Sequence, residues 1–201
     1  MNSTPSAIRK LTPFIFFLAL VGLPRQTTAQ QGDSEPHYIG EKFGGGIVFL
    51  VYEKGQHGLI ASMKDLGIFA FFPSCEGYTP NERAQLLNKL GSMPGLTFSS
   101  EYEGKKNTAN LITRYGGLPS NSPFAALACS KYDAGGYKDW YLPSAYELKA
   151  LFDNLFIINT ILEQDNDPET VKLYEQGDYW CSTLYGDYPI TFRQNEGKLN
   201  I

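Results

Sequence analysis

Residues 135–152 constrain the fold more than any other part of the chain, because they specify a turn, a short strand and a helix start in succession. Gly135 and Gly136 free the backbone for a turn, and residues 140–142 are an apolar run typical of a strand. Pro143 ends that run and favours an extended backbone at the residue before it. Nothing in the segment is an evident nucleophile, base or metal ligand.

Ser144 and Glu147 then form the S-x-x-E pattern of a capping box. In this motif the serine hydroxyl accepts from the backbone N–H of residue 147, and the carboxylate accepts from the N–H of residue 144. Leu148, Leu151 and Phe152 are spaced three and four apart, which gives the following helix a buried stripe. The pattern predicts a helix that begins after Ser144 and packs on the core.

An apolar segment near the N-terminus predicts export. Residues 13–23 carry no charge and follow Arg9 and Lys10, as in a secretory signal peptide, and they are too short for a membrane-spanning helix of about 20 residues. Small residues at Thr27 and Ala29 place cleavage after Ala29. We expect residues 1–29 to be the signal peptide, residues 30–40 a linker and residues 41–201 the domain, exported to the periplasm, the outer surface or the medium. An uncleaved membrane anchor is the alternative.

The charge of the chain argues against nucleic acid as a partner. The formal net charge is −4, and the predicted signal peptide carries three positive and no negative charges, so its removal leaves −7 on 172 residues. Nucleic acid is bound largely by neutralising phosphates with Lys and Arg, and Lys105-Lys106 is the only basic doublet of the predicted mature chain. The remaining length is sufficient for one domain with a core.

The chain has three cysteines: Cys75, Cys129 and Cys181. In an oxidising compartment an odd number permits one disulfide and one free thiol, and the sequence leaves all three pairings open. Catalysis by cysteine needs a base, and the predicted mature chain has only His37, in the linker, and His57, in a turn. We therefore do not expect a catalytic cysteine.

The remaining patterns predict one α+β domain of antiparallel strands with two or more short helices. The Gly44–46 triplet precedes a strand and opens no helix, so it does not predict a phosphate loop. The expected strands are residues 47–52 and 59–62, which form a hairpin, then 140–142, 179–183 and 190–193. The expected helices are residues 81–90, a short helix capped by Asn107 and one after Pro123 that carries Cys129. The helix that begins after Ser144 and its continuation over 156–162 complete the set. Residues 66–72 fit either a strand or a helical turn.

Four motifs follow one another along the chain: GGIVF at 45–49, HGLIAS at 57–62, D-W-x-L-P-S-x-x-E-L at Asp139, Trp140, Leu142, Pro143, Ser144, Glu147 and Leu148, and Y-W-x-S-T at Tyr179, Trp180, Ser182 and Thr183. In this order they resemble the motifs of the C-terminal domain family of the Legionella collagen-like adhesin. The match spans residues 44–193. The resemblance implies a C-type-lectin-like fold, a binding role at the bacterial cell surface and no enzyme activity or cofactor.

The C-terminal part departs from that family. No counterpart of its last strand is evident before Ile201, so we expect an exposed sheet edge that invites pairing with another chain, a homo-oligomer among the alternatives. The chain also lacks a G-x-y repeat, which is the sequence pattern of the adhesin's collagen-like stalk.

Two segments are candidates for ligand binding. Tyr185, Asp187 and Tyr188, beyond the YWCST strand, are the residues we predict to stack on sugars, whereas Trp140 and Trp180 belong to framework motifs and are expected in the core. Residues 163–169 contain four acidic residues and an asparagine, but they lack the EF-hand order of ligands. We expect a solvated acidic loop without a metal.

These observations predict an exported, non-catalytic binding module that recognises a glycan or a cell-surface protein. A structural or assembly component of the cell envelope is the alternative. A carbohydrate-active hydrolase is a weaker one, since a carboxylate pair at the required spacing of roughly 5–10 Å exists only in three dimensions.

Overall fold

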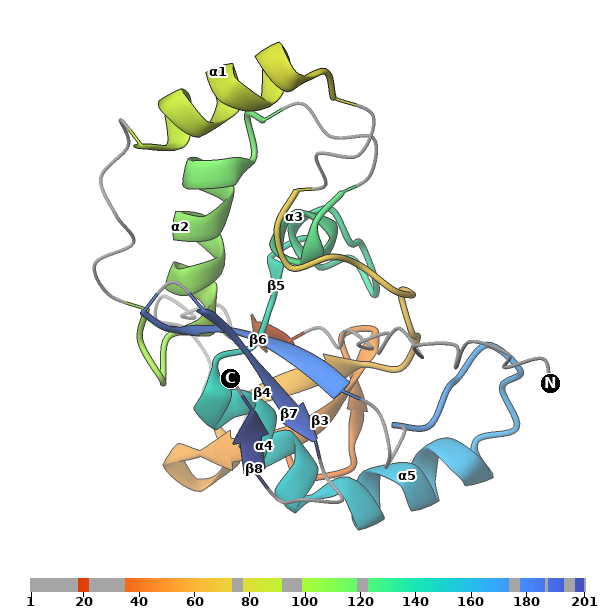
Figure 1. Ribbon diagram of the computed structural model, residues 1–201. Helices are drawn as coiled ribbons and strands as arrows, with labels where there is room; N and C mark the ends of the chain where they lie inside the picture. The colour runs from red at the N-terminus through yellow and green to blue at the C-terminus, as the bar shows by residue number, and fades with distance from the viewer. Residues whose placement is uncertain are drawn as a thin grey trace, which may run out of the picture.

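The computed structural model describes residues 18–21, 35–73, 78–91, 99–118, 123–173, 178–186, 188–193 and 198–200. These residues form two antiparallel sheets and five α-helices (Figure 1). The fold is therefore α+β, as predicted.

The larger sheet has the strand order β2-β3-β4-β1-β5. Its strands are β1 (Leu18–Val21), β2 (Lys42–Phe43), β3 (Gly46–Tyr52), β4 (His57–Ser62) and β5 (Trp140–Tyr141). The predicted hairpin is present, with β3 and β4 joined by a short 3-10 turn, η1 (Glu53–Gly55). Strand β1 pairs with β4 on one side and with β5 on the other.

The smaller sheet has the order β6-β7-β8, formed by β6 (Asp178–Tyr185), β7 (Tyr188–Arg193) and β8 (Lys198–Asn200). The expectation that no last strand follows residues 188–193 was wrong, because three residues of β8 pair with β7 in antiparallel register. The alternating pattern that identifies a strand needs more than three residues, so the sequence carried no signal for β8.

The helices are α1 (Pro80–Gly91), α2 (Gly104–Tyr115), α3 (Ala125–Ser130), α4 (Ala145–Asp153) and α5 (Leu155–Gln164). The capping box at the start of α4 is confirmed, with both of its hydrogen bonds present. None of the helices in the described part of the chain has the length and apolar character that a membrane span requires.

Asn107 does not cap α2, in contrast to the sequence expectation. The helix begins three residues earlier, at Gly104, and Asn107 lies buried within it. Its amide Nδ2 donates to the carbonyl of Ser100 at 2.6 Å, and its Oδ1 accepts from the N–H of Ser100 at 2.8 Å. Asn107 therefore holds the preceding loop against the helix.

The alternation of side chains along the strands divides the core in two. Ile47 and Phe49 of β3 pack with α4 and α5, whereas Val48 between them packs with α2 and α3. The same division separates Tyr141 from Trp140 in β5, because successive strand residues point to opposite faces. The sheets thus lie between the helix pair α2 and α3 on one side and α4 and α5 on the other (Figure 1).

The glycine triplet serves a close approach of two backbone segments. Gly45 and Gly135 both have positive φ, at 80° and 60°, a region that favours glycine. A Cβ added to Gly45 would lie 2.5 Å from the backbone nitrogen of Gly135. The turn before β3 therefore packs directly on the turn before β5, which agrees with a structural role for both glycine motifs.

Two further segments are irregular. Residues 66–72 form neither the strand nor the helical turn that the sequence suggested; the carbonyl of Ala70 accepts from the N–H of Ala125 at 2.9 Å and thereby positions the start of α3. Residues 35–40, within the predicted linker, lie against the β3–β4 hairpin. The His37 N–H donates to the Gly55 carbonyl at 2.9 Å.

Candidate functional site

The predicted sugar-stacking residues Tyr185 and Tyr188 face each other at the end of the β6–β7 hairpin. They are cross-strand partners in the antiparallel register, and their side chains are 66% and 67% exposed. Residues directly opposite in a sheet project from the same face, so the two rings form one surface. Gly186, with φ of 62°, makes the turn between them, and Asp187 lies outside the described residues.

A second exposed tyrosine pair was not predicted from the sequence. The rings of Tyr102, before α2, and Tyr146, in the first turn of α4, have centroids 5.1 Å apart at 48°. They are 64% and 49% exposed. Since 44 positions separate these residues in the chain, no local pattern could have paired them.

Hydrogen bonds join the backbones that carry the two pairs. The Thr183 hydroxyl donates to the carbonyl of Ser100 and accepts from the N–H of Ala145, each at 3.0 Å. The N–H of Leu184 donates to Ser99 Oγ at 2.6 Å, and the N–H of Tyr146 donates to the carbonyl of Glu101 at 3.0 Å. The end of β6, the loop before α2 and the start of α4 therefore meet here. We call Tyr102, Tyr146, Tyr185 and Tyr188 the tyrosine surface.

The D-W-x-L-P-S-x-x-E-L and Y-W-x-S-T motifs contact each other through hydrogen bonds. Ser182 donates to the carbonyl of Pro143 twice, from its N–H at 2.6 Å and its hydroxyl at 3.1 Å. Together with the bond from Ala145 to Thr183, this contact attaches the Y-W-x-S-T strand to the start of α4. The motif residues thus build the support beneath the tyrosine surface.

The remaining motif residues also have structural positions. Trp140 is buried, and its indole N–H donates to the Tyr137 carbonyl at 3.0 Å. Trp180 is half-buried against Phe71, with its indole N–H donating to the Phe69 carbonyl at 3.2 Å. Leu142, Leu148 and Tyr179 are fully buried, and Asp139 forms an exposed ion pair with Lys105 at 2.9 Å.

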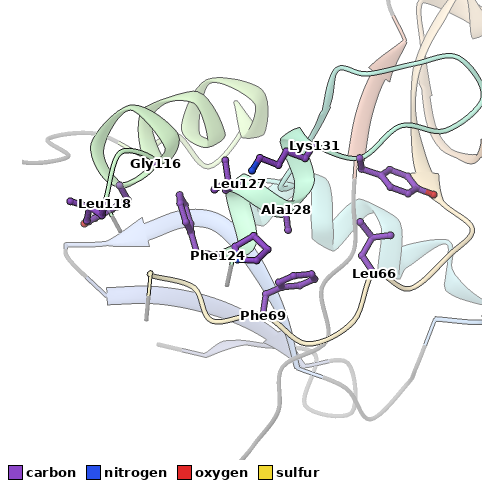
Figure 2. Close-up of a pocket in the computed structure, with 11 residues that line it drawn as sticks. Leu66, Phe69, Gly116, Leu118, Phe124, Leu127, Ala128 and Lys131 are labelled. Atoms are coloured by element: carbon purple, nitrogen blue, oxygen red, sulfur yellow. The ribbon is translucent and has the colours of Figure 1, made fainter. Parts of the chain in front are cut away.

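A cavity of about 580 Å³ lies on the α2–α3 side of the fold. Its described lining comes from the segment after β4, the C-terminal end of α2, the residues before α3, α3 itself and the residues that follow it (Figure 2). The lining is mostly apolar and aromatic: Leu66, Phe69, Tyr115, Gly116, Leu118, Pro123, Phe124, Leu127, Ala128, Lys131 and Tyr132. Lys131 is the one charged residue among them, so this described lining offers neither a carboxylate pair nor a histidine or cysteine.

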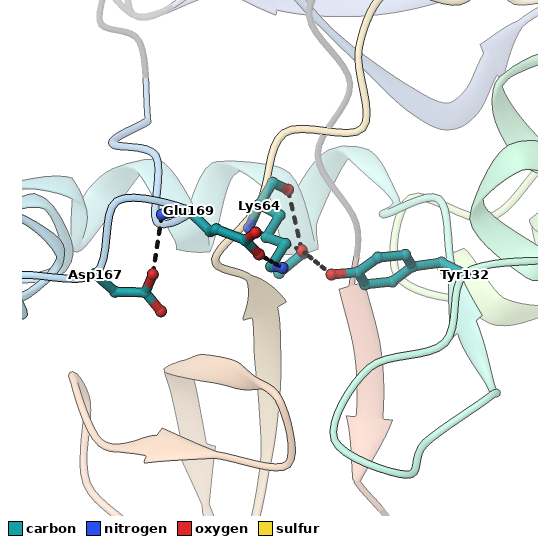
Figure 3. Close-up of polar contacts among 5 residues, drawn as sticks. Lys64, Tyr132, Asp167 and Glu169 are labelled. Carbon is teal, nitrogen blue, oxygen red and sulfur yellow. Dashed lines mark hydrogen bonds and ion pairs between the residues drawn. The ribbon is translucent and has the colours of Figure 1, made fainter.

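The acidic loop is largely exposed, as expected, and three of its four carboxylates also pair with lysines. Asp165 bonds to Lys42 at 2.6 Å, and Glu163 bonds to Lys172 at 2.7 Å. Glu169 bonds to Lys64, as Figure 3 shows. The hydrogen bond from Lys42 holds the pKa of Asp165 below its usual value. Among the described residues, no group of three or more His, Cys, Asp or Glu side chains is arranged to hold a metal ion.

The expected disulfide is not formed by the two cysteines that the structure describes. Cys129 and Cys181 are both buried free thiols, and they belong to different halves of the core. Burial raises the pKa of Cys129 well above its ordinary value and that of Cys181 to about 12, so both are poor nucleophiles. Cys75 lies outside the described residues.

No family model matches this chain, and searches of curated proteins and of solved structures find no significant match.

Proposed function

We propose that this chain is an exported, non-catalytic binding module that recognises a glycan or a protein partner through the tyrosine surface. The observation that carries the proposal is the cross-strand pair of Tyr185 and Tyr188, two large rings left two-thirds exposed side by side. Tyrosine contributes a broad apolar face and a hydroxyl that hydrogen-bonds, which suits it to binding surfaces.

The support beneath these rings favours binding over a chance exposure. Thr183 and Leu184 precede Tyr185 directly, and both are hydrogen-bonded to the loop before α2. A surface whose backbone is fixed loses little conformational freedom on binding, and this preorganisation improves affinity. Of the two partner classes, a glycan is preferred because C–H faces of sugar rings match flat aromatic rings.

The alternatives rest on other features. A structural or assembly component of the envelope would need no small ligand and would use the exposed surface for protein contacts. A carbohydrate-active hydrolase needs two carboxyl groups about a sugar ring apart, and the described lining of the cavity does not supply them. We therefore rank the hydrolase last.

A glycan array probed with the exported protein tests the proposal. We expect a defined set of glycans to bind, and we expect Tyr185→Ala/Tyr188→Ala to weaken that binding at least tenfold, since tyrosines at the centre of an interface often contribute 2 kcal/mol or more. Tyr38→Ala is the matched control, because Tyr38 is 65% exposed but lies before β2, outside the tyrosine surface.

A second double variant, Tyr102→Ala/Tyr146→Ala, shows whether both pairs contact the ligand. Equal binding by the wild type and both double variants would exclude the tyrosine surface as the site. Turnover of a polysaccharide panel by the wild type would instead support the hydrolase.

A further inference from the structure

The cavity on the α2–α3 side of the fold is separate from the tyrosine surface. None of the four tyrosines of that surface is among the described residues that line the cavity. Its volume of about 580 Å³ lies within the range of roughly 300–1,000 Å³ that is typical of small-molecule sites. The cavity can therefore hold a small ligand of its own.

Apolar side chains from three separate parts of the chain line this cavity. Leu118, after α2, and Phe124 and Ala128, at the start and in the middle of the α3 region, are buried. Leu66 and Phe69, from the segment after β4, are partly exposed and line the same space (Figure 2). A ligand that covers these side chains removes apolar surface from water, and this burial is a main driving force for binding.

Several of the lining side chains are aromatic, and neighbouring groups hold them in place. The four rings are those of Phe69, Tyr115, Phe124 and Tyr132. Tyr115 contacts Phe124 edge-on with ring centroids 6.3 Å apart, and Tyr132 contacts Trp140 in the same way at 5.1 Å. The Ser62 hydroxyl also donates to the Tyr132 hydroxyl at 3.0 Å. Rings that are already fixed lose little freedom when a ligand binds, and they favour an aromatic ligand because its ring can stack or pack edge-on against them.

The one charged side chain of the described lining is positive. Lys131 forms no ion pair with any residue that the structure describes, whereas Lys138, seven positions later, pairs with Asp133 at 3.2 Å. Next to the cavity, the Arg114 guanidinium carbon lies 5.6 Å from the centroid of the Tyr115 ring. An anionic group on a ligand would gain a charge-assisted contact with Lys131, and a cationic group would be repelled.

We infer that this cavity is a binding site for a small aromatic molecule that carries a single anionic group, such as a carboxylate or a sulfonate. The aromatic body of the ligand lies against Phe69 and Phe124, and its anionic group contacts the ammonium of Lys131. One lysine within the lining matches one negative charge, since further anionic groups placed in an apolar cavity would have no partner. The inference does not depend on the function proposed for the tyrosine surface.

The test uses the full chain and two fluorescent probes that share one ring system. Anilinonaphthalene sulfonate carries a single negative charge, and phenylnaphthylamine has the same rings without the sulfonate. We expect each probe to bind saturably, with one molecule per chain, and its fluorescence to rise as it enters the cavity.

Lys131→Gln separates the charge from the apolar contacts. We expect this variant to raise the Kd of the sulfonate probe at least threefold, which is the effect of losing one partly exposed ion pair, and to leave the Kd of the neutral probe unchanged. Lys54→Gln is the matched control, because Lys54 is also exposed but does not line the cavity. It should leave both Kd values unchanged.

Leu66→Trp tests the cavity itself. The larger side chain enters from the irregular segment after β4 and occupies part of the space, so we expect both probes to bind at least tenfold more weakly. A melting curve shows whether the variant is folded. If it is not, the Lys131→Gln comparison decides the question alone, because that side chain is exposed.

Four results would overturn the inference: no saturable binding of the sulfonate probe, an equal effect of Lys131→Gln on both probes, unchanged binding by folded Leu66→Trp, or loss of probe binding in Tyr185→Ala/Tyr188→Ala. The last result would place the probe on the tyrosine surface. Unchanged probe binding in that double variant, whether or not it binds glycans, would support a separate site in the cavity.

Discussion

Tyr141 donates its hydroxyl to Oε1 of Glu147 at 3.0 Å, and both side chains are buried. The other carboxylate oxygen, Oε2, accepts from the N–H of Ser144 at 2.7 Å. The capping box of α4 is thus linked to strand β5 and has little access to water. Burial raises the pKa of Glu147, although its hydrogen bonds with Ser144 and Tyr141 oppose the rise. Burial, with the nearby Glu147 charge, also raises the pKa of Tyr141, so its hydroxyl stays protonated and able to donate.

The raised pKa of Glu147 predicts a pH dependence of stability. The folded chain holds the carboxyl proton more tightly than the unfolded chain, so this group's contribution is greatest below its unfolded pKa and is lost as pH rises through the raised folded pKa. We expect Glu147→Gln, which keeps an acceptor for Ser144, to remove this contribution. The measurement is urea unfolding of both proteins over a pH series. The wild type should lose stability relative to the variant as pH rises through that window, and the opposite slope would contradict the assignment.

Glu147→Ala separates the hydrogen bonds from the charge. This variant leaves the Ser144 N–H and the Tyr141 hydroxyl without their partner, and a buried polar group without a partner costs about 1–3 kcal/mol. We expect it to be less stable than Glu147→Gln at every pH, with the difference measured from the same unfolding curves.

Ser144→Ala tests the cap itself. The Ser144 hydroxyl accepts from the N–H of Glu147 at 3.3 Å, and removal of such a cap typically costs about 1 kcal/mol. Thr160→Ala is the control, because Thr160 lies half-buried within α5, where its hydroxyl donates to the Phe156 carbonyl at 2.8 Å and caps no helix end. An unchanged urea midpoint for Ser144→Ala would show that the cap does not stabilise α4.

The two tryptophans should differ in their contribution to stability. Trp140 is fully enclosed, and Trp→Ala in a core costs about 3–5 kcal/mol. Trp180 is only half-buried, so we expect Trp180→Ala to reduce the free energy of unfolding by less than Trp140→Ala. Equal losses of unfolding free energy in the two variants would contradict the half-buried position of Trp180.

The sequence predicted the structural elements that depend on residues close together in the chain. The capping box, the Gly135–Gly136 turn and the β3–β4 hairpin each depend on residues a few positions apart, and all three are present. Asn107 shows the limit of such reasoning. An asparagine can bond the first N–H groups of a helix or the backbone of a loop, and only the packing of residues 99–103 decided for the loop.

The candidate site was predicted in part for the same reason. Tyr185 and Tyr188 are three positions apart across a turn, so a hairpin brings them together. Tyr102 and Tyr146 meet only because Thr183 and Glu101 join distant segments. The place of Leu18–Val21 between β4 and β5 likewise depends on two strands about 80 positions apart, and a hydrophobic run alone does not specify its partner.

Cys129 and Cys181 should be unreactive in the folded protein. Both are buried with raised pKa values, so little thiolate forms near neutral pH, and the reagent has no access. We expect labelling by a thiol-specific reagent to require unfolding, after which both residues react without any reductant. Detection of a disulfide-linked peptide containing either residue would contradict this.

The acidic loop should not bind calcium specifically. Three of its four carboxylates already bond to lysines, and Ca²⁺ would have to displace Lys42 from Asp165 and Lys64 from Glu169. We therefore expect millimolar calcium and magnesium at equal ionic strength to change the melting temperature equally, through screening of exposed pairs. A bound ion at a hundredfold excess over its Kd would instead add about 2.7 kcal/mol. A rise in melting temperature with calcium alone, lost in Asp165→Asn/Asp167→Asn, would overturn this prediction and support a calcium-dependent lectin.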